Sequence, residues 1–185
     1  MKTTDFGSEG LLLVTRNVYG DERGFFVERF KRSEFEGSGI PSDFVQVNQS
    51  RSAPGVLRGL HYQHSPAQGK LVGVTRGKIW DVAVDLRKES PTFGRSYGVE
   101  LSDLNGQLLW IPAGFAHGFC VIGDEPADVL YNTTAEYEPK TEGGIVWNDP
   151  DLAIEWPLSE PQLSARDLEL PTFADFRADP PDWRE

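Results

Sequence analysis

Short stretches in which apolar and polar residues alternate recur along the whole chain. In the clearest one, residues 78–86, Trp80, Val82 and Val84 fall on one face and Asp81 falls on the other. Successive side chains of a β-strand point to opposite faces, so this alternation predicts a half-buried strand. The same pattern predicts strands at residues 11–14, 25–30, 44–49, 70–75, 97–101, 108–111 and 129–133.

Turn signals separate these runs, and helical periodicity is weak. Glycine, proline, asparagine or aspartate marks turns at 20–22, 53–55, 76–77, 105–106, 112–114 and 142–144. The candidates for short helices are residues 33–36 and 164–170, the latter with Ser164 as N-cap and Asp167 at the capping-box position. Many short strands joined by turns predict an all-β protein, an antiparallel sandwich or jelly-roll barrel with a few short helices.

Length and composition narrow the class of protein. The 185 residues fit one domain, 1–185, with an irregular surface tail from about residue 171. The net charge of −11 argues against attraction to nucleic acid or to an anionic membrane. The single cysteine, Cys120, excludes an intramolecular disulfide and a cysteine-based zinc cluster. No apolar run approaches the roughly 20 residues of a membrane span, so we expect a soluble, cytoplasmic protein.

Only three histidines, His61, His64 and His117, are available for histidine-dependent chemistry. The segment from Pro112 to His117 reads Pro-x-Gly-x-x-His, which is the outline of a cupin barrel, and many cupins bind a metal through an earlier His-x-His and a glutamate. Here His61 and His64 are three residues apart, so strict alternation places them on opposite faces. The next charged residue is Lys70, a poor neighbour for a dication. We therefore expect no metal site.

Several segments occur together in the order typical of one family. They are residues 20–26 (GDERGFF), 56–63 (VLRGLHYQ), 68–72 (QGKLV), 81–87 (DVAVDLR), 111–119 (IPAGFAHGF), 147–150 (WNDP) and 163–167 (LSARD). With these segments the chain resembles the dTDP-4-dehydrorhamnose 3,5-epimerases from about residue 13 to residue 170. The resemblance implies a cupin-like jelly roll that acts as a homodimer, without metal or organic cofactor, in deoxysugar synthesis.

The resemblance also implies a role for four side chains. Epimerisation beside a keto group needs a base for the α-proton, a group that holds the enolate oxygen, and an acid that returns a proton to the opposite face. His61 matches the base and Asp167 matches the residue that orients it. Tyr131 matches the acid. Lys70 matches the residue whose positive charge lies near the enolate oxygen.

The remaining matches concern substrate binding. Three arginines, Arg23, Arg58 and Arg166, fall on positions where the family contacts its substrate, and guanidinium groups suit phosphate oxygens. Tyr137 matches the aromatic residue that stacks on thymine. The other expected contacts are Phe26, Glu28, Gln46, Val47 through its backbone, Asn48, His117 and Glu142.

The resemblance also bears on the subunit arrangement and on the strand that carries Arg58 and His61. The apolar segment 20–30 is expected to pair with the sheet of a second copy, which places Arg23 and Glu28 in the partner's pocket. Arg58 and His61 have opposite parity, although the family places both in one pocket. Gly59 lies between them and would permit a β-bulge that resets the alternation, but alternation alone leaves this open.

Other functions compatible with these residues stay open. A relative that inverts only one carbon would carry nearly the same motifs. A non-catalytic sugar-nucleotide-binding cupin would not need His61, Tyr131 and Asp167 together. A metal-dependent cupin is disfavoured by Lys70 and by the spacing of the histidines. Asn132 is a departure from the family, because a basic residue commonly follows the acid tyrosine.

Overall fold

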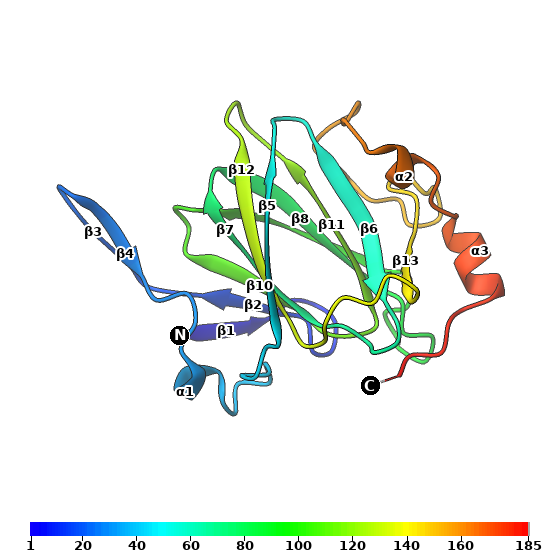
Figure 1. Cartoon of the computed structure of the whole chain (residues 1–185), viewed down its shortest axis with the longest axis horizontal. Helices are drawn as coiled ribbons and strands as arrows, with labels where there is room; N and C mark the ends of the chain where they lie inside the picture. The colour runs from blue at the N-terminus through cyan, green and yellow to red at the C-terminus, as the bar shows by residue number, and fades with distance from the viewer. Residues whose placement is uncertain (185) are drawn as a thin grey trace.

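The computed structural model describes residues 1–184 and is dominated by two antiparallel β-sheets that face each other (Figure 1). The first sheet has the strand order β1 (Lys2–Asp5), β2 (Leu12–Thr15), β10 (Gln107–Ile111), β7 (Lys70–Arg76), β12 (Ala127–Thr133), β5 (Gln46–Ser52). The second has the order β13 (Glu142–Gly144), β6 (Leu57–Gln63), β11 (Phe115–Val121), β8 (Lys78–Asp85), β9 (Ser96–Ser102). The predicted antiparallel, cupin-like jelly roll is confirmed.

The main core fills the space between the two sheets. It is built from the inward-facing apolar residues of both, among them Val72, Leu109, Val129, Ala83 and Phe115. Burial of such side chains is the main favourable term in folding. This core occupies part of the barrel, and polar residues line the remainder.

The prediction for residues 78–86 needs a correction, because β8 is buried on both of its faces from Asp81 onwards. Trp80 and Val82 face a second apolar cluster that the C-terminal part of the chain lays over the sheet. Ile79 and Ala83, on the other face, belong to the core between the sheets. Asp81 shares this inward face and is fully buried, so the polar face of the strand lies inside the barrel and not in solvent.

The alternating runs locate most strands to within two or three residues. The run at 25–30 is only partly a strand, because β4 (Gly24–Val27) ends at Val27. Alternation did not predict β1, β3 (Val18–Asp21), β6, β11 or β13. Every residue of β11 is buried, so this central strand has no polar face that alternation could reveal.

Three short helices complete the fold: α1 (Arg32–Phe35), α2 (Ala165–Leu168) and α3 (Phe173–Ala178). The first two confirm the expected helical segments. The third corrects the expectation of an irregular tail from about residue 171. Thr172 and Asp175 form a capping box at its start, and Phe173 and Phe176 are buried against the second sheet.

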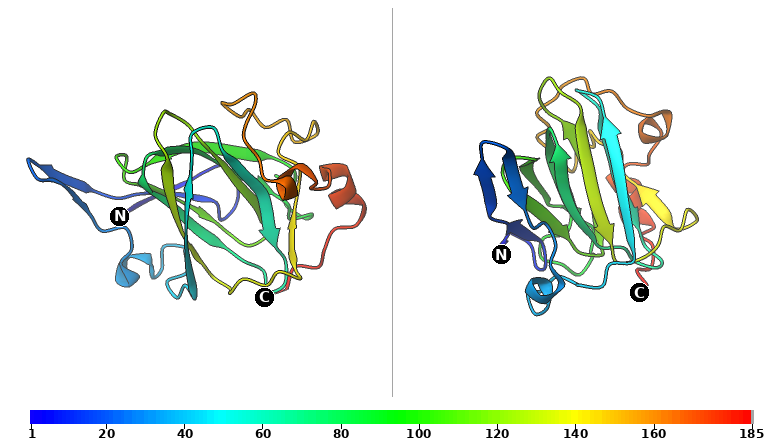
Figure 2. Two further views of the ribbon diagram at one scale, coloured as in Figure 1. Left: turned by 45° about the horizontal axis from the view of Figure 1, so that its top comes forward. Right: turned by 60° about the vertical axis from the view of Figure 1, so that its left-hand side comes forward.

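The hairpin of β3 and β4 projects away from the barrel, on the side opposite α2 (Figures 1 and 2). Its aromatic side chains are unusually accessible, with Tyr19 60% and Phe26 63% exposed. Among residues 1–184, no helix has the length and apolar character required to cross a bilayer.

Candidate active site

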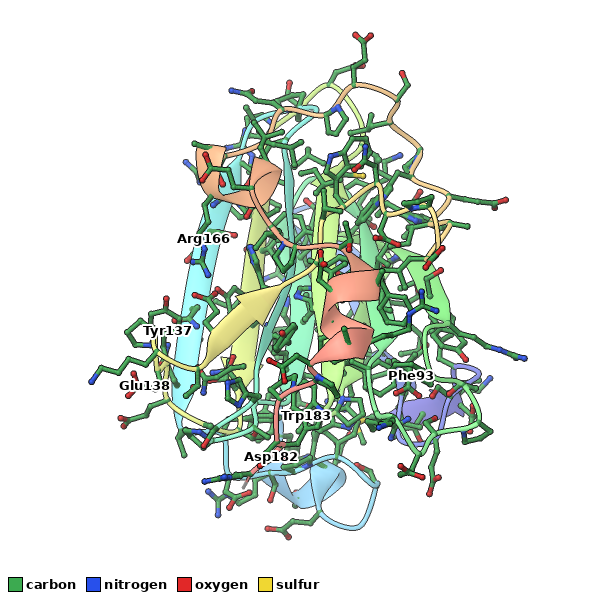
Figure 3. The ribbon with its side chains drawn as sticks, turned by 90° about the vertical axis from the view of Figure 1, so that its right-hand side faces the viewer. Phe93, Tyr137, Glu138, Arg166, Asp182 and Trp183 are labelled. Atoms are coloured by element: carbon green, nitrogen blue, oxygen red, sulfur yellow. The ribbon has the colours of Figure 1, made fainter. Side chains whose placement is uncertain are left out.

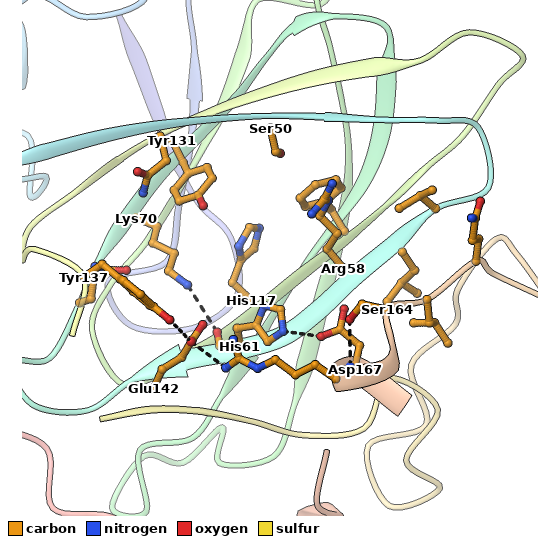
Figure 4. A pocket seen from close by; sticks show the side chains of 18 residues that line it. Ser50, Arg58, His61, Lys70, His117, Tyr131, Tyr137, Glu142, Ser164 and Asp167 are labelled. Carbon is orange, nitrogen blue, oxygen red and sulfur yellow. Dashed lines mark hydrogen bonds and ion pairs between the residues drawn. The ribbon is translucent and has the colours of Figure 1, made fainter. Parts of the chain in front are cut away.

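A cavity of about 530 Å³ opens between the two sheets, where the polar part of the barrel interior lies (Figure 4). Strands of both sheets, the loop before β13 and helix α2 contribute its walls. The residues of the predicted site that border it are Asn48, Arg58, His61, Lys70, His117, Tyr131, Tyr137, Glu142, Arg166 and Asp167. The fold thus brings distant parts of the chain to one polar cavity. Asn48 and Asp167, for example, both line it although they are 119 positions apart.

His61 and Asp167 form a hydrogen-bonded pair at the wall of this cavity. Nε2 of His61 lies 2.7 Å from Oδ1 of Asp167, and the carboxylate is almost completely buried. Burial opposes ionisation of Asp167, but hydrogen bonds from His61, from the Gly59 backbone N–H and from Ser164 outweigh it and lower the pKa of the carboxyl. With Nε2 held by a carboxylate, Nδ1 is the nitrogen left to act as a base.

Helix α2 places Asp167 against this histidine. Ser164 is the N-cap, and its hydroxyl accepts the backbone N–H of Asp167 at 3.1 Å. The expected cap is therefore confirmed. Asp167 occupies the capping-box position, yet its carboxylate accepts hydrogen bonds from His61 and the Gly59 backbone. The Asp167 carboxylate is therefore paired with residues of β6, far away in the chain, instead of with the N-terminal backbone of its own helix.

A β-bulge in β6 brings Arg58 and His61 to the same cavity. His117 of β11 pairs with His61 and Phe119 pairs with Arg58, so the register shifts by one residue between them. Gly59 lies in this bulge with φ of +109°, and a Cβ there would come within 2.6 Å of the His117 carbonyl oxygen. The bulge that Gly59 would permit is therefore present, and it requires glycine.

Lys70, the first residue of β7, extends its ammonium group into the cavity. Nζ lies 3.5 Å from the His61 carbonyl oxygen. Burial lowers the pKa of Lys70 to about 8, although Glu142 and Asp81 attract the charged form. The ammonium is therefore poorly hydrated, and a bound anionic oxygen would interact with it strongly.

Tyr131 faces the cavity from β12, next to the inner face of β5. Burial raises the pKa of the Tyr131 phenol, so the hydroxyl carries its proton at neutral pH. Its neighbour across the ladder is Asn48. The Gln46 side chain donates to the side-chain oxygen Oδ1 of Asn48 at 2.9 Å and accepts the backbone N–H of Tyr137 at 2.9 Å. Gln46 thus supports two lining residues from just outside the cavity.

One edge of the cavity is an aromatic and charged rim. Glu142 accepts hydrogen bonds at 2.7 Å from both the Tyr137 hydroxyl and the Arg166 guanidinium. Burial opposes ionisation of Glu142, but these two bonds outweigh it and lower its pKa. Figure 3 shows Tyr137 and Arg166 along the same edge of the molecule. Tyr137 is half exposed, so its ring is accessible to a planar ligand.

Among residues 1–184, no group of three or more histidine, cysteine, aspartate or glutamate side chains is placed to hold a metal ion. The only cysteine, Cys120, is buried beside Asp81, and burial raises the pKa of its thiol to about 12. It is a buried apolar residue and not a reactive thiol.

Comparison with known proteins identifies the family. The family model for dTDP-4-dehydrorhamnose 3,5-epimerase matches residues 6–175. The chain belongs to this family. The Pseudomonas aeruginosa dTDP-4-dehydrorhamnose 3,5-epimerase is 53% identical over 177 residues, which cover 95% of this chain and 97% of that protein.

Solved structures extend the likeness to the whole architecture of this epimerase family. A Legionella pneumophila 3,5-epimerase in complex with dTDP-4-keto-L-rhamnose is 45% identical and superposes with a TM-score of 0.92, covering 100% of this chain and 98% of that one. A 3′-monoepimerase from Streptomyces bikiniensis in complex with dTDP-quinovose is 35% identical, with a TM-score of 0.86, covering 93% of this chain and 88% of that one.

Besides Gln46, which lies just outside, four of the predicted site residues do not border the cavity of their own chain. Arg23 and Phe26 belong to the projecting hairpin and Glu28 follows it, and none of the three borders the cavity. The Arg23 guanidinium pairs with Asp21 in the hairpin turn. Val47 points to the opposite face of β5 from Asn48 and is 59% exposed, so only its backbone can face the sheet interior.

Several lining residues were not among the predicted site residues. They are Ser50, Val56, Leu57, Gln68, Phe119, Gln162, Leu163 and Ser164. Ser50 could have been found, because it continues the two-residue period of Gln46 and Asn48 along β5. Gln162 gave no such signal, because it reaches the cavity through a parallel bridge with Val56 that depends on the tertiary structure.

Proposed function

We propose that the protein converts dTDP-4-dehydro-6-deoxy-D-glucose into dTDP-4-dehydro-L-rhamnose by inverting C3 and C5, in dTDP-L-rhamnose biosynthesis. One observation carries this proposal. The cavity combines a carboxylate-held imidazole, an ammonium group and a protonated phenol, contributed by His61, Lys70 and Tyr131. These are the base, the enolate-stabilising charge and the acid that a stepwise inversion beside a ketone requires.

In the proposed reaction, His61 removes the proton from the carbon next to the 4-keto group. Nε2 donates to Asp167, so Nδ1 takes the proton, and the carboxylate stabilises the imidazolium that forms. The electron pair of the C–H bond moves into the enolate. The negative charge then collects on the 4-oxygen, where the Lys70 ammonium stabilises it.

Inversion requires that a proton return to the opposite face of the carbon. We assign this step to the Tyr131 hydroxyl, which carries its proton at neutral pH because burial raises its pKa. The phenolate that results takes a proton from solvent and the His61 imidazolium releases its proton to solvent, so both groups return to their starting states. Repetition of the two steps at the second carbon gives the double epimer.

The nucleotide end of the substrate is proposed to bind along the rim. Tyr137 offers a half-exposed ring for stacking on thymine, and Arg58 and Arg166 offer guanidinium groups to the diphosphate. These cations matter because the net charge of −11 repels an anionic ligand. Gln46, Asn48, His117 and Glu142 are proposed to complete the contacts.

The active unit is proposed to be a homodimer with shared sites. The hairpin of β3 and β4 projects from the barrel with exposed aromatic side chains, and it carries Arg23 and Phe26 away from their own cavity. If the hairpin pairs with a second copy, Arg23, Phe26 and Glu28 can enter the partner's cavity. The added guanidinium would bring a further positive charge to the diphosphate.

An alternative is single epimerisation, and the likeness to the Streptomyces bikiniensis 3′-monoepimerase supports it. Incubation of the protein with dTDP-4-dehydro-6-deoxy-D-glucose in D₂O, followed by NMR, separates the two. We expect deuterium at both C3 and C5. Deuterium at C3 alone would assign the protein to the mono-epimerases, and no deuterium at either carbon would refute epimerisation.

A further inference from the structure

Asp81 of β8 is a buried carboxylate with an incomplete set of hydrogen bonds. Its Oδ1 lies 2.7 Å from Nε2 of His117, and the residue is 0% exposed. Its Oδ2 has no hydrogen-bond partner within residues 1–184. Burial of a carboxylate is costly unless partners compensate for the loss of water.

A neighbouring carboxylate on the same strand shows what a structural role looks like. Asp85 is equally buried, but its two oxygens accept hydrogen bonds from Ser8, Ser90, Thr92 and Arg87. Asp85 thereby ties the loop that follows β8 to the loop between β1 and β2. Asp81 fastens no loop, because its one hydrogen-bond partner is the ring of a cavity-lining histidine.

The position of His117 ties this pair to the reacting end of the cavity. His117 of β11 pairs directly with His61 of β6, so the two rings lie next to each other (Figure 4). Each ring has Nε2 against a buried carboxylate, Asp167 for His61 and Asp81 for His117. In both, Nδ1 is the nitrogen left for a ligand.

We propose that Asp81 is a positioning residue that fixes His117 in the tautomer with the proton on Nε2, so that the Nδ1 lone pair accepts a hydrogen bond from a hydroxyl group of the sugar. The assignment rests on the proposed function for the identity of the sugar. This role explains why a carboxylate is buried here. An ionised aspartate can only accept a hydrogen bond, so it requires the proton on Nε2, whereas an amide in its place could also donate and so permit the other tautomer.

The unpaired Oδ2 adds an electrostatic component. Burial disfavours the charged form of Lys70, and the negative charge of Asp81 favours it by attraction. The carboxylate therefore supports two neighbouring groups, the His117 ring by a hydrogen bond and Lys70 by charge.

The test compares two ligands on the Asp81→Asn variant by calorimetry. The affinity for dTDP-quinovose, which carries sugar hydroxyls, should fall by roughly tenfold, the effect of about one hydrogen bond. The affinity for dTDP, which lacks the sugar, should stay within about twofold of the unsubstituted protein. Equal loss for both ligands, or loss for neither, would overturn the proposal.

A second readout does not depend on activity. With ¹⁵N-labelled histidine, NMR of the unsubstituted protein should show His117 with its proton on Nε2, and Asp81→Asn should add a population protonated on Nδ1. The matched control, Asp85→Asn, should lower the melting temperature while it leaves the His117 signals and both affinities unchanged. A proton on Nδ1 in the unsubstituted protein would refute this assignment even if double epimerisation is observed, and failure of epimerisation would leave the tautomer result standing.

Discussion

At the scale of single residues, two histidines of one segment have different surroundings. His61 borders the cavity with its ring held by Asp167. His64 lies outside it, and its Nδ1 is 3.2 Å from the backbone oxygen of Asp182. His64 follows the end of β6 at Gln63, and no bulge lies between it and His61, so the odd spacing of three residues turns the two side chains to opposite faces.

This contrast gives a direct test of the base. His61→Asn keeps a planar polar side chain but removes the basic nitrogen, so deuterium exchange at C3 and C5 should fall by about 10²–10⁴-fold. His64→Asn is the matched control and should exchange at nearly the rate of the unsubstituted protein. NMR in D₂O measures both. Near-normal exchange in His61→Asn would remove His61 from the mechanism.

The charge of Lys70 predicts an alkaline limit to activity. Its pKa is lowered to about 8, so the ammonium is present below that pH and is lost as the pH rises through it. If the charge stabilises the enolate, kcat should decline above about pH 8. Lys70→Arg carries a charge that does not titrate in this range, so its remaining activity should lack this decline. A decline that persists unchanged in Lys70→Arg would assign it to another group.

At the scale of elements, the bulge in β6 is the feature on which the site depends. Gly59 has no room for a side chain, because a Cβ would lie 2.6 Å from the His117 carbonyl oxygen. Gly55 also has a positive φ, +77°, but nothing lies within 4 Å of a Cβ there. A side chain at Gly59 would therefore clash with the backbone, whereas a side chain at Gly55 would only strain the local conformation.

We expect Gly59→Ala to cost more stability than Gly55→Ala. The change at Gly55 should lower the free energy of unfolding by about 1 kcal/mol, from backbone strain alone. The change at Gly59 adds a backbone clash and should cost roughly 3 kcal/mol or more, with loss of activity as Arg58 and His61 lose their common face. Denaturant unfolding measures both. Equal costs would show that the bulge can relax around a methyl group.

Helices α2 and α3 offer a second matched pair. Ser164 caps α2 and Thr172 caps α3, each by accepting a backbone N–H at 3.1 Å. Ser164→Ala and Thr172→Ala should each reduce stability by about 1 kcal/mol. Only Ser164→Ala should also reduce kcat, because α2 carries Asp167. If both variants keep the kcat of the unsubstituted protein, the orientation of Asp167 does not depend on the cap.

At the scale of the whole molecule, the projecting hairpin predicts a shared site. Arg23→Ala and His61→Ala should each be nearly inactive, the first because the partner's cavity loses a cation. After subunit exchange in a mixture of the two, one cavity of each heterodimer combines an intact His61 with an intact Arg23, so partial activity should return. Absence of activity after demonstrated exchange would place Arg23 within its own subunit.

Most strands, the fold class and the residue types of the site could be predicted from the amino-acid sequence. Alternation is a local property, so it located β5, β7 and β12, while the resemblance to the family indicated Gln46 and Asn48. The family motifs identified residues that the fold brings to one cavity, such as His61 and Asp167.

The tertiary structure decided which faces are buried and which polar groups meet. Asp81 lies on what alternation identified as the polar face of β8, yet it is fully buried, because the C-terminal segment covers the opposite face and the barrel encloses this one. Its contact with His117 joins residues 36 positions apart. Local pattern cannot predict such a contact, since the free energy that favours it comes from packing between sheets and not from either strand alone.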